Sequence, residues 1–284
     1  MKRSEQQART RRLVLFVGRV NDPAWKDQMP WLREACELVC CATIAAAEHW
    51  LAGTQRFPVM VIFAQPRRDF YVAADIKRLM QLLPMAHLVS LEGSWCEGAS
   101  RSGQPYEGLQ RCYWYQFRPR MANLLGLDVS SSGKDDGGLL NGLWTETENE
   151  RAIAASKRAL PSGSGLLGIA ARDLVTYDSL DQACRLAGYR TSWLRSGTVD
   201  VPLGLRAIVA DVDDVLEAEV LLNQLPAEAA AIPCVVLAHF PRLADVKRLS
   251  SDGRTTVVAK PFRLHDLLWL LAESIEVDRL GRAA

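Results

Sequence analysis

The sequence is poor in the residues that most often build metal and disulfide sites. It contains seven cysteines and four histidines in 284 residues, and no two cysteines form a Cys-x-x-Cys pair. An odd number of cysteines without paired spacing indicates neither a disulfide framework nor a zinc knuckle. Most of them lie in apolar runs, where a thiol behaves as a small hydrophobic side chain. We therefore expect no bound metal ion and no cofactor.

An excess of one charge and long apolar runs are also missing. The chain has 34 basic and 33 acidic residues, a formal net charge of +1, so no global field attracts nucleic acid or an anionic membrane. No segment approaches the roughly 18–20 apolar residues of a membrane span. The apolar run at Leu13–Val17 stops at Gly18 without a cleavage site, unlike a signal peptide. We expect a cytoplasmic protein that contacts neither membrane nor nucleic acid, with residues 1–11 as a solvated basic tail.

Apolar runs alternate with segments of helical periodicity in two halves of the chain. The length suits two domains, and the hydrophobic fraction of 49% is ordinary for globular proteins. Residues 128–165 are rich in Gly and Ser at both ends and read as a flexible linker with one candidate helix. We predict α/β domains at 12–127 and 166–284, each with a doubly wound parallel sheet.

The N-terminal half departs from a regular alternation. Its clearest strand is Phe57–Ala64, which is apolar throughout, as expected of a parallel strand covered on both faces. We expect the other strands and helices of this half at 12–19, 38–43, 44–51, 69–83, 86–91 and 111–117. The Gly-, Ser- and Pro-rich segment 92–108 replaces a helix before the last strand, so we interpret this half as the more divergent domain.

The C-terminal half is more regular. We expect its five strands at 166–171, 189–194, 205–211, 233–238 and 255–260. Helical segments separate most of them, with Asp173 and Asp214 placed to cap two of the helices. This arrangement matches the flavodoxin-like doubly wound layout.

One stretch suggests a family. Thr255–Phe262 is a β-branched run that ends in Lys-Pro-Phe, and Arg263–Leu271 then has the pattern of a helix. This order resembles the last strand and last helix of response-regulator receiver domains; the N-terminal half is only weakly similar. The resemblance implies a flavodoxin-like fold and, in active members, phosphoryl transfer from a histidine kinase to an aspartate with the help of Mg²⁺.

The resemblance also assigns candidate site residues. It places Asp211 at the phospho-acceptor position and Lys260 at the position that contacts the phosphoryl group. However, the first strand of this half ends Ile169-Ala170-Ala171 without the acidic pair, and Ala238 replaces the expected hydroxyl residue. Without the acids, Mg²⁺ has few ligands and the transfer loses its main charge stabilisation. We therefore interpret this half as a pseudo-receiver in which Asp211 pairs with Lys260 or caps a helix; the alternative is an atypical receiver phosphorylated at Asp211.

Two further features are candidate contact sites. An Arg101-Ser-Gly-Gln-Pro loop near Arg111 and Trp114 is a candidate binding loop for an anion or a peptide, or else a surface turn over a packed strand. In the last helix the leucines share one face and Trp269 points the other way. Receivers meet partners through the face of helix 4, strand 5 and helix 5, so Trp269 is a candidate interface residue. The alternative is that another segment of the chain covers it.

These features lead to one expectation and two alternatives. We expect a non-catalytic signalling or scaffolding protein, not an enzyme, that binds a protein partner or a second copy through the helix 4, strand 5 and helix 5 face. The alternatives are a response regulator phosphorylated at Asp211, and a small-molecule or nucleotide sensor or enzyme that uses the N-terminal domain. A dinucleotide fingerprint is not indicated, because the Gly-x-Gly-x-x-Gly at 163–168 precedes a strand instead of linking a strand to a helix.

Overall fold

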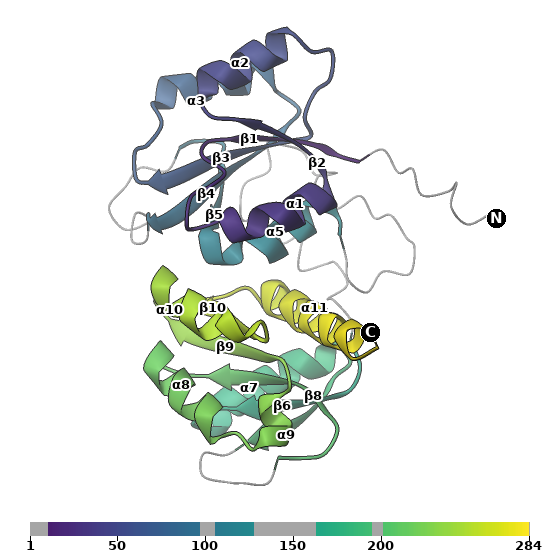
Figure 1. Cartoon of the computed structure of the whole chain (residues 1–284). Coiled ribbons are helices and arrows are strands. Elements are labelled where there is room, and N and C mark those ends of the chain that lie inside the picture. The colour runs from purple at the N-terminus through teal and green to yellow at the C-terminus, as the bar shows by residue number, and fades with distance from the viewer. Residues whose placement is uncertain (1–10, 97–105, 128–162, 195–200, 284) are drawn as a thin grey trace, which may run out of the picture. The chain divides into compact units, whose positions relative to one another are not determined.

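The structure is a computed structural model that describes residues 11–96, 106–127, 163–194 and 201–283. The described residues form two compact units, 11–127 and 163–283, which we call the N-terminal and C-terminal units (Figure 1). Each unit contains a five-stranded parallel sheet with helices between its strands. The predicted fold class of two doubly wound α/β domains is thereby confirmed. The predicted tail at 1–11 and the linker at 128–165 lie almost entirely outside the described residues.

The N-terminal unit has the strand order β2-β1-β3-β4-β5. Its strands are β1 (Leu13–Val17), β2 (Glu37–Cys41), β3 (Met60–Arg67), β4 (His87–Trp95) and β5 (Gln110–Tyr113). Its α-helices are α1 (Met29–Ala35), α2 (Ile44–Ala52), α3 (Ala73–Leu82) and α5 (Phe117–Leu125). Right-handed crossovers that leave β1 in opposite directions place their helices on opposite faces. Accordingly, α1 and α5 cover one face and α2 and α3 the other (Figure 1).

The C-terminal unit repeats this order, as β10-β9-β8-β6-β7. Its strands are β6 (Leu166–Ala170), β7 (Arg190–Leu194), β8 (Leu205–Asp211), β9 (Cys234–His239) and β10 (Thr255–Lys260). Its α-helices are α7 (Leu174–Leu186), α8 (Val215–Gln224), α9 (Ala227–Ala230), α10 (Leu243–Leu249) and α11 (Leu264–Ala283). All five strands agree with the prediction to within one residue at each end.

Side-chain caps explain where two helices of this unit begin. The carboxylate of Asp173 accepts a hydrogen bond from the backbone N–H of Thr176, at 2.8 Å, at the start of α7. Asp214 does the same for the N–H of Glu217, at 2.9 Å, at the start of α8. Each cap satisfies a donor that the first helical turn leaves unpaired. The predicted capping positions are confirmed.

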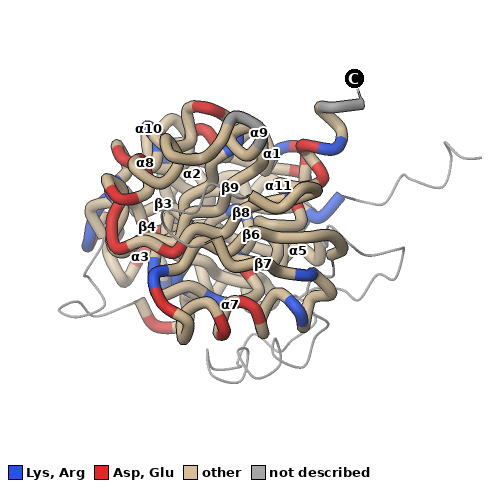
Figure 2. Tube along the Cα trace, turned by 90° about the horizontal axis from the view of Figure 1, so that it is seen from below, with Lys and Arg blue, Asp and Glu red and all other residues tan. Residues whose placement is uncertain are grey.

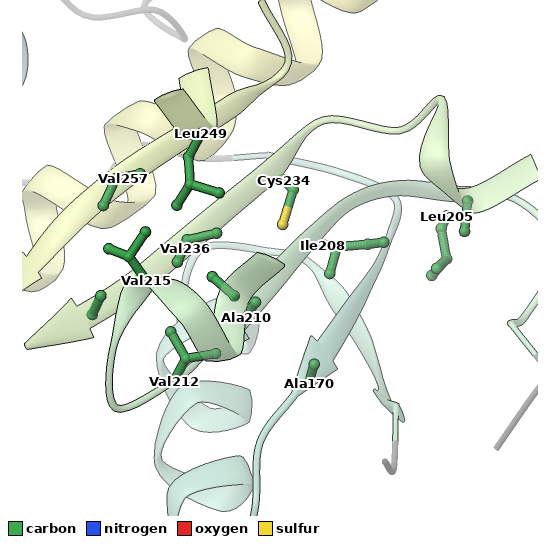
Figure 3. Close-up of a cluster of buried hydrophobic side chains, with 13 residues drawn as sticks. Ala170, Leu205, Ile208, Ala210, Val212, Val215, Cys234, Val236, Leu249 and Val257 are labelled. Carbon is green, nitrogen blue, oxygen red and sulfur yellow. The ribbon is translucent and has the colours of Figure 1, made fainter. Parts of the chain in front are cut away.

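Buried aliphatic side chains fill the space between one face of this sheet and its helices. Alternate residues of β8 and β9, among them Ile208, Ala210 and Val236, pack against Val215 of α8 and Leu249 of α10 (Figure 3). Fully burying a valine or isoleucine contributes roughly 1.5–3 kcal/mol. This layer holds the carboxyl ends of β8 and β9 in fixed positions.

The N-terminal unit differs from the prediction near its last strand. The expected strand 111–117 ends at Tyr113, and a 3₁₀ turn (Trp114–Gln116) leads directly into α5. The side-chain oxygen of Gln116 accepts a hydrogen bond from the N–H of Tyr113, at 3.4 Å, which turns the chain. Trp114 and Phe117 are both buried, and their spacing of three residues suits a helical turn rather than an alternating strand.

The described residues contain no helix that could span a membrane and show no large region of a single charge sign. Among these residues, no helix combines the length and the apolar character needed to cross a bilayer. Lys and Arg positions are interspersed with Asp and Glu positions along the trace (Figure 2), in keeping with the near-zero net charge.

Candidate functional site at the carboxyl edge of the C-terminal sheet

The carboxyl ends of parallel strands meet at one edge of the sheet, where doubly wound folds bind their ligands. In the C-terminal unit this edge gathers charged residues from separate strands. Asp211 ends β8, Lys260 ends β10, and Arg172 follows β6 after one intervening residue. From the sequence, roles are predicted for Asp211 and Lys260 but none for Arg172.

Asp211 and Lys260 form an ion pair across the end of β9. The Nζ of Lys260 lies 2.8 Å from Oδ1 of Asp211, and the two side chains are only 15% and 21% exposed. β8 and β10 are not neighbours, because β9 pairs with both of them. The pair therefore links two strands that share no backbone hydrogen bonds. The phospho-acceptor role of Asp211 remains a prediction.

Arg172 lies at the end of β6, close to where the receiver resemblance expects an acidic pair. Its guanidinium donates hydrogen bonds to Oδ2 of Asp213 and to Oε1 of Glu217, the latter at 2.9 and 3.0 Å. These two carboxylates raise the pKa of Arg172. The Arg172 side chain is 56% exposed, so water screens the contacts and their effect on stability is small. Through these hydrogen bonds, Asp213 and Glu217 already have Arg172 as a cationic partner.

The carboxylates at this edge do not form a metal centre. Within the described ranges, no group of three or more His, Cys, Asp or Glu side chains is arranged to hold a metal ion. Asp211 contacts an ammonium group and Asp213 a guanidinium. A divalent ion here would have to compete with both cations for these oxygens.

Strand register identifies the corresponding positions in the N-terminal unit. Asp211 pairs with Leu237, and in the N-terminal sheet Ala64 pairs with Leu91. Lys260 lies two residues after Val258, the partner of Leu237. Trp114 lies two residues after Cys112, the partner of Leu91, just beyond the end of β5. This edge therefore has an alanine and a tryptophan where the C-terminal unit has its ion pair, and it offers no carboxylate at the acceptor position.

The edge of the N-terminal sheet is also closed by the protein's own tyrosine. The Tyr71 hydroxyl lies 2.8 Å from the carbonyl oxygen of Val17, the last residue of β1, and 3.0 Å from that of Ala64, which follows the last β1–β3 pair within β3. A Cβ at Gly18 (φ +132°) would come within 2.9 Å of both the Tyr71 hydroxyl and the Ala64 Cβ. Burial raises the pKa of Tyr71, so the phenol remains neutral. Tyr71 thus occupies the space beside the carboxyl end of β1, next to Ala64 of β3.

The predicted binding loop of this unit requires correction. Arg101 lies outside the described residues. Arg111 belongs to β5, where its guanidinium donates to both carboxylate oxygens of buried Glu92, at 2.7 and 2.8 Å. Trp114 is only 3% exposed. Neither Arg111 nor Trp114 is an exposed binding residue, because one is held in an ion pair and the other packs in the core, which agrees with the alternative of a packed strand.

The prediction that Trp269 is an exposed interface residue is wrong, whereas the alternative that another segment of the chain covers it agrees with its burial. Its side chain is 3% exposed, and every residue from Leu267 to Leu271 is buried. Helical periodicity assigned one face of α11 to solvent, but this stretch has no exposed face. Exposed apolar residues occur later in the helix, at Val277 and Leu280.

Comparisons with known proteins give only distant similarities. No family model matches the chain, and no curated protein matches it. Among solved structures, D-2-hydroxyisocaproate dehydrogenase is similar at 8% identity and a TM-score of 0.24, covering 96% of this chain and 98% of that one. A putative D-3-phosphoglycerate dehydrogenase from Ralstonia solanacearum is similar at 10% identity and a TM-score of 0.23, covering 96% of this chain and 95% of that one.

These neighbours correct one prediction. Both proteins are named as dehydrogenases, which contradicts the expectation that the chain is not an enzyme, and we withdraw that expectation. At these identities and TM-scores, the likeness assigns no reaction, substrate or cofactor to the chain.

Proposed function

We propose that the chain is a signalling or scaffolding protein whose C-terminal unit binds another protein through the carboxyl edge of its sheet. The observation that supports this proposal is a set of exposed apolar side chains at that edge, which we call the apolar rim. Its members, with their exposed fractions, are Leu174 (54%), Val175 (77%), Leu216 (66%) and Phe240 (71%).

The apolar rim comes from three separate connections. Leu174 and Val175 open α7 after β6, Leu216 lies in the first turn of α8 after β8, and Phe240 follows β9. Single exposed apolar residues are normal on protein surfaces. These four gather because the parallel strands bring the start of each connection to one edge. Such a surface can bury apolar area against a partner.

Phe240 has a backbone conformation that supports a role for its side chain. Its φ of +44° is left-handed, which glycine and asparagine adopt most readily. A bulky residue in this region costs about 1–2 kcal/mol. An exposed phenylalanine that is retained at this cost is consistent with a binding role.

The charged groups named beside the apolar rim each have a partner of opposite sign within the chain. Asp211 is paired with Lys260, and Asp213 and Glu217 with Arg172. A partner that covers this edge would not have to neutralise a lone buried charge, which is the main cost of burying ionic groups at an interface. The receiver resemblance of β10 and α11 adds support for a signalling role.

The partner can be captured with a photo-crosslinking amino acid in place of Val175, in cells that produce the full chain. Its affinity is then measured with purified proteins. We expect Leu216→Ser and Phe240→Asn each to weaken binding about tenfold, as for residues central to an interface. Asparagine is chosen because it tolerates the left-handed conformation at this position.

Leu186→Ser is the matched control. Leu186 is 75% exposed but lies at the far end of α7, away from the carboxyl edge. The control should bind as the wild type does. Equal affinity of the wild type and the Leu216→Ser/Phe240→Asn double variant would refute the proposed surface.

A further inference from the structure

The N-terminal unit has an open pocket beside α3, which residues of the connection between β4 and β5 also line. α2 and α3 cover this face of the sheet, but the described residues between β4 and β5 contain no helix. Tyr106 and Leu109, from this connection, pack against the core instead. The chain approaches α3 closely at Gly108 (φ +78°), where a Cβ would lie 2.7 Å from Cε of Met80.

This α3 pocket has a cavity volume of about 820 Å³. Pockets that bind small molecules measure roughly 300–1,000 Å³ and are mostly apolar with a few polar groups. Its apolar surface includes Ile76 and Met80 of α3, together with two alanines at the start of that helix. The pocket is therefore large enough for a small organic molecule.

Two tyrosines give the pocket a fixed wall. The Tyr106 hydroxyl donates to the backbone carbonyl of Tyr71 at 2.5 Å, and the Tyr71 hydroxyl is bound at the strand ends. Burial raises the pKa of both phenols, so neither ionises near neutral pH. Because both hydroxyls are used within the protein, the rings offer mainly apolar and aromatic surface to a ligand.

The charged groups of the pocket have opposite signs. Asp69, Lys77 and Glu107 line it. Asp69 contacts only the exposed Arg68, at 3.2 Å, among the ion pairs of the described residues, and no such pair involves Lys77 or Glu107. Asp69 also has a left-handed φ of +52°. Aspartate adopts this conformation more readily than most residues, and it fixes the backbone that carries the carboxylate.

We infer that the α3 pocket binds a small zwitterion with an apolar body, of the size of an amino acid to a tripeptide. Its ammonium group would contact Asp69 or Glu107, its carboxylate Lys77, and its apolar part Ile76, Met80 and the tyrosine rings. Each charged end gains a charge-assisted hydrogen bond, which is stronger than a neutral one. The inference concerns the other unit and does not depend on the proposed function.

The same lining disfavours other ligand classes. A nucleotide would bring several negative charges to a site whose described lining carries two acids and one lysine, and no glycine occurs among those described lining residues. A neutral apolar ligand would remove water from three charged groups without replacing their hydrogen bonds. A zwitterion satisfies both signs at once.

Calorimetry with the full chain tests the inference, using L-leucine, L-phenylalanine, leucyl-leucine and trileucine as probes. We expect saturable binding of at least one probe below about 10 mM, the weak end for ligands of this size. N-acetyl and C-amide forms of that probe should each bind about tenfold more weakly, because each loses one charged contact. Asp69→Asn keeps a residue suited to the left-handed conformation while removing the charge.

The protein variants should reproduce the effects of blocking the ligand. In Lys77→Met, the free and the amidated probe should bind with equal affinity, because the partner of the carboxylate is gone. In Asp69→Asn or Glu107→Gln, the free and the acetylated probe should bind with equal affinity, because the partner of the ammonium group is gone. Ala74→Phe fills the pocket and should abolish binding, whereas Lys26→Met, an exposed lysine of the same unit, should change nothing. Absence of saturable binding for all four probes, or binding unaffected by Ala74→Phe, would overturn the inference.

Discussion

The ion pair between Asp211 and Lys260 gives the most direct test of the C-terminal edge. At 2.8 Å, and with an effective dielectric constant of about 20, Coulomb's law gives a gross attraction of roughly 6 kcal/mol. Removal from water offsets most of this energy. A hydrogen bond between charged groups retains about 1.5–3 kcal/mol. Since both side chains are largely buried, we expect a coupling energy in that range.

A double-mutant cycle measures this coupling. Asp211→Asn and Lys260→Met should each destabilise the C-terminal unit, and the double variant should lose less stability than the sum of the two. The full chain is unfolded in urea, and hydrogen exchange at the amides of β8 and β10 is the readout, so that the signal comes from this unit alone. The pair of Arg248 and Glu219, at 2.6 Å but 52% and 32% exposed, is the control and should show a much smaller coupling.

Two results would refute the interpretation of this pair as a fixed structural contact. One is a coupling energy below about 0.5 kcal/mol, which is no more than an exposed pair contributes. The other is stoichiometric acyl phosphate at Asp211 after incubation with acetyl phosphate and Mg²⁺. The second result would favour the phosphorylation-regulated alternative, with Lys260 contacting the phosphoryl group.

Three further predictions follow from single residues. Gly18→Ala should destabilise the N-terminal unit by about 2–3 kcal/mol in urea unfolding, because its Cβ meets Ala64 and Tyr71 at 2.9 Å and its φ is +132°. Burial alone would raise the pKa of Asp252. Hydrogen bonds from the N–H groups of Arg254 and Thr255 and from the Thr255 hydroxyl lower it by more than burial raises it, so the pKa in the folded state is below the ordinary value. The stabilisation by ionised Asp252 is therefore fully present above the pKa of the unfolded state and is lost as pH falls through the pKa of the folded state. Asp252→Asn should make the free energy of unfolding depend less on pH in acid. Iodoacetamide should modify Cys40 first, because the other six cysteines are buried, and slowly at neutral pH, because desolvation raises the Cys40 pKa.

The strands and caps of the C-terminal unit could be predicted because their signals are local. Most of these strands contain an apolar run bounded by Gly, Pro or a capping acid, and Asp173 and Asp214 bind N–H groups three residues away. The contact of Arg172 with Glu217 had a usable signal too. An arginine after the first strand and acids after the third are expected to meet at the carboxyl edge. The contact was not predicted because the receiver resemblance draws attention to the missing acidic pair at the end of this strand and not to the arginine that follows it.

The errors concern burial, which depends on residues far apart in the sequence. Trp114 and Trp269 were candidate contact residues on the basis of loop composition and periodicity, with burial as the alternative, and both are 3% exposed. Periodicity describes one element and does not report what packs on its other side. The closure of the N-terminal edge was missed for the same reason, since the Tyr71 hydroxyl binds the carbonyl of Val17, 54 residues earlier.

Tyr71 connects the two features of the N-terminal unit and allows them to be separated. Its hydroxyl occupies the space beside the end of β1 and Ala64 of β3, and the residue also lines the α3 pocket. Tyr71→Phe removes only the hydroxyl, so it should cost about 1 kcal/mol in urea unfolding and leave zwitterion binding nearly unchanged. Tyr71→Ala also removes the ring and should abolish binding.

The reasoning behind this difference can be checked on the neighbouring residue. The Tyr106 hydroxyl donates to the backbone carbonyl of Tyr71, so the side-chain change in Tyr71→Phe leaves that wall in place. If Tyr71→Phe instead lost binding as completely as Tyr71→Ala, the ligand would be using the space beside the end of β1 and Ala64 of β3. The two sheets of this chain would then bind at equivalent edges, and the α3 pocket would not be the ligand site.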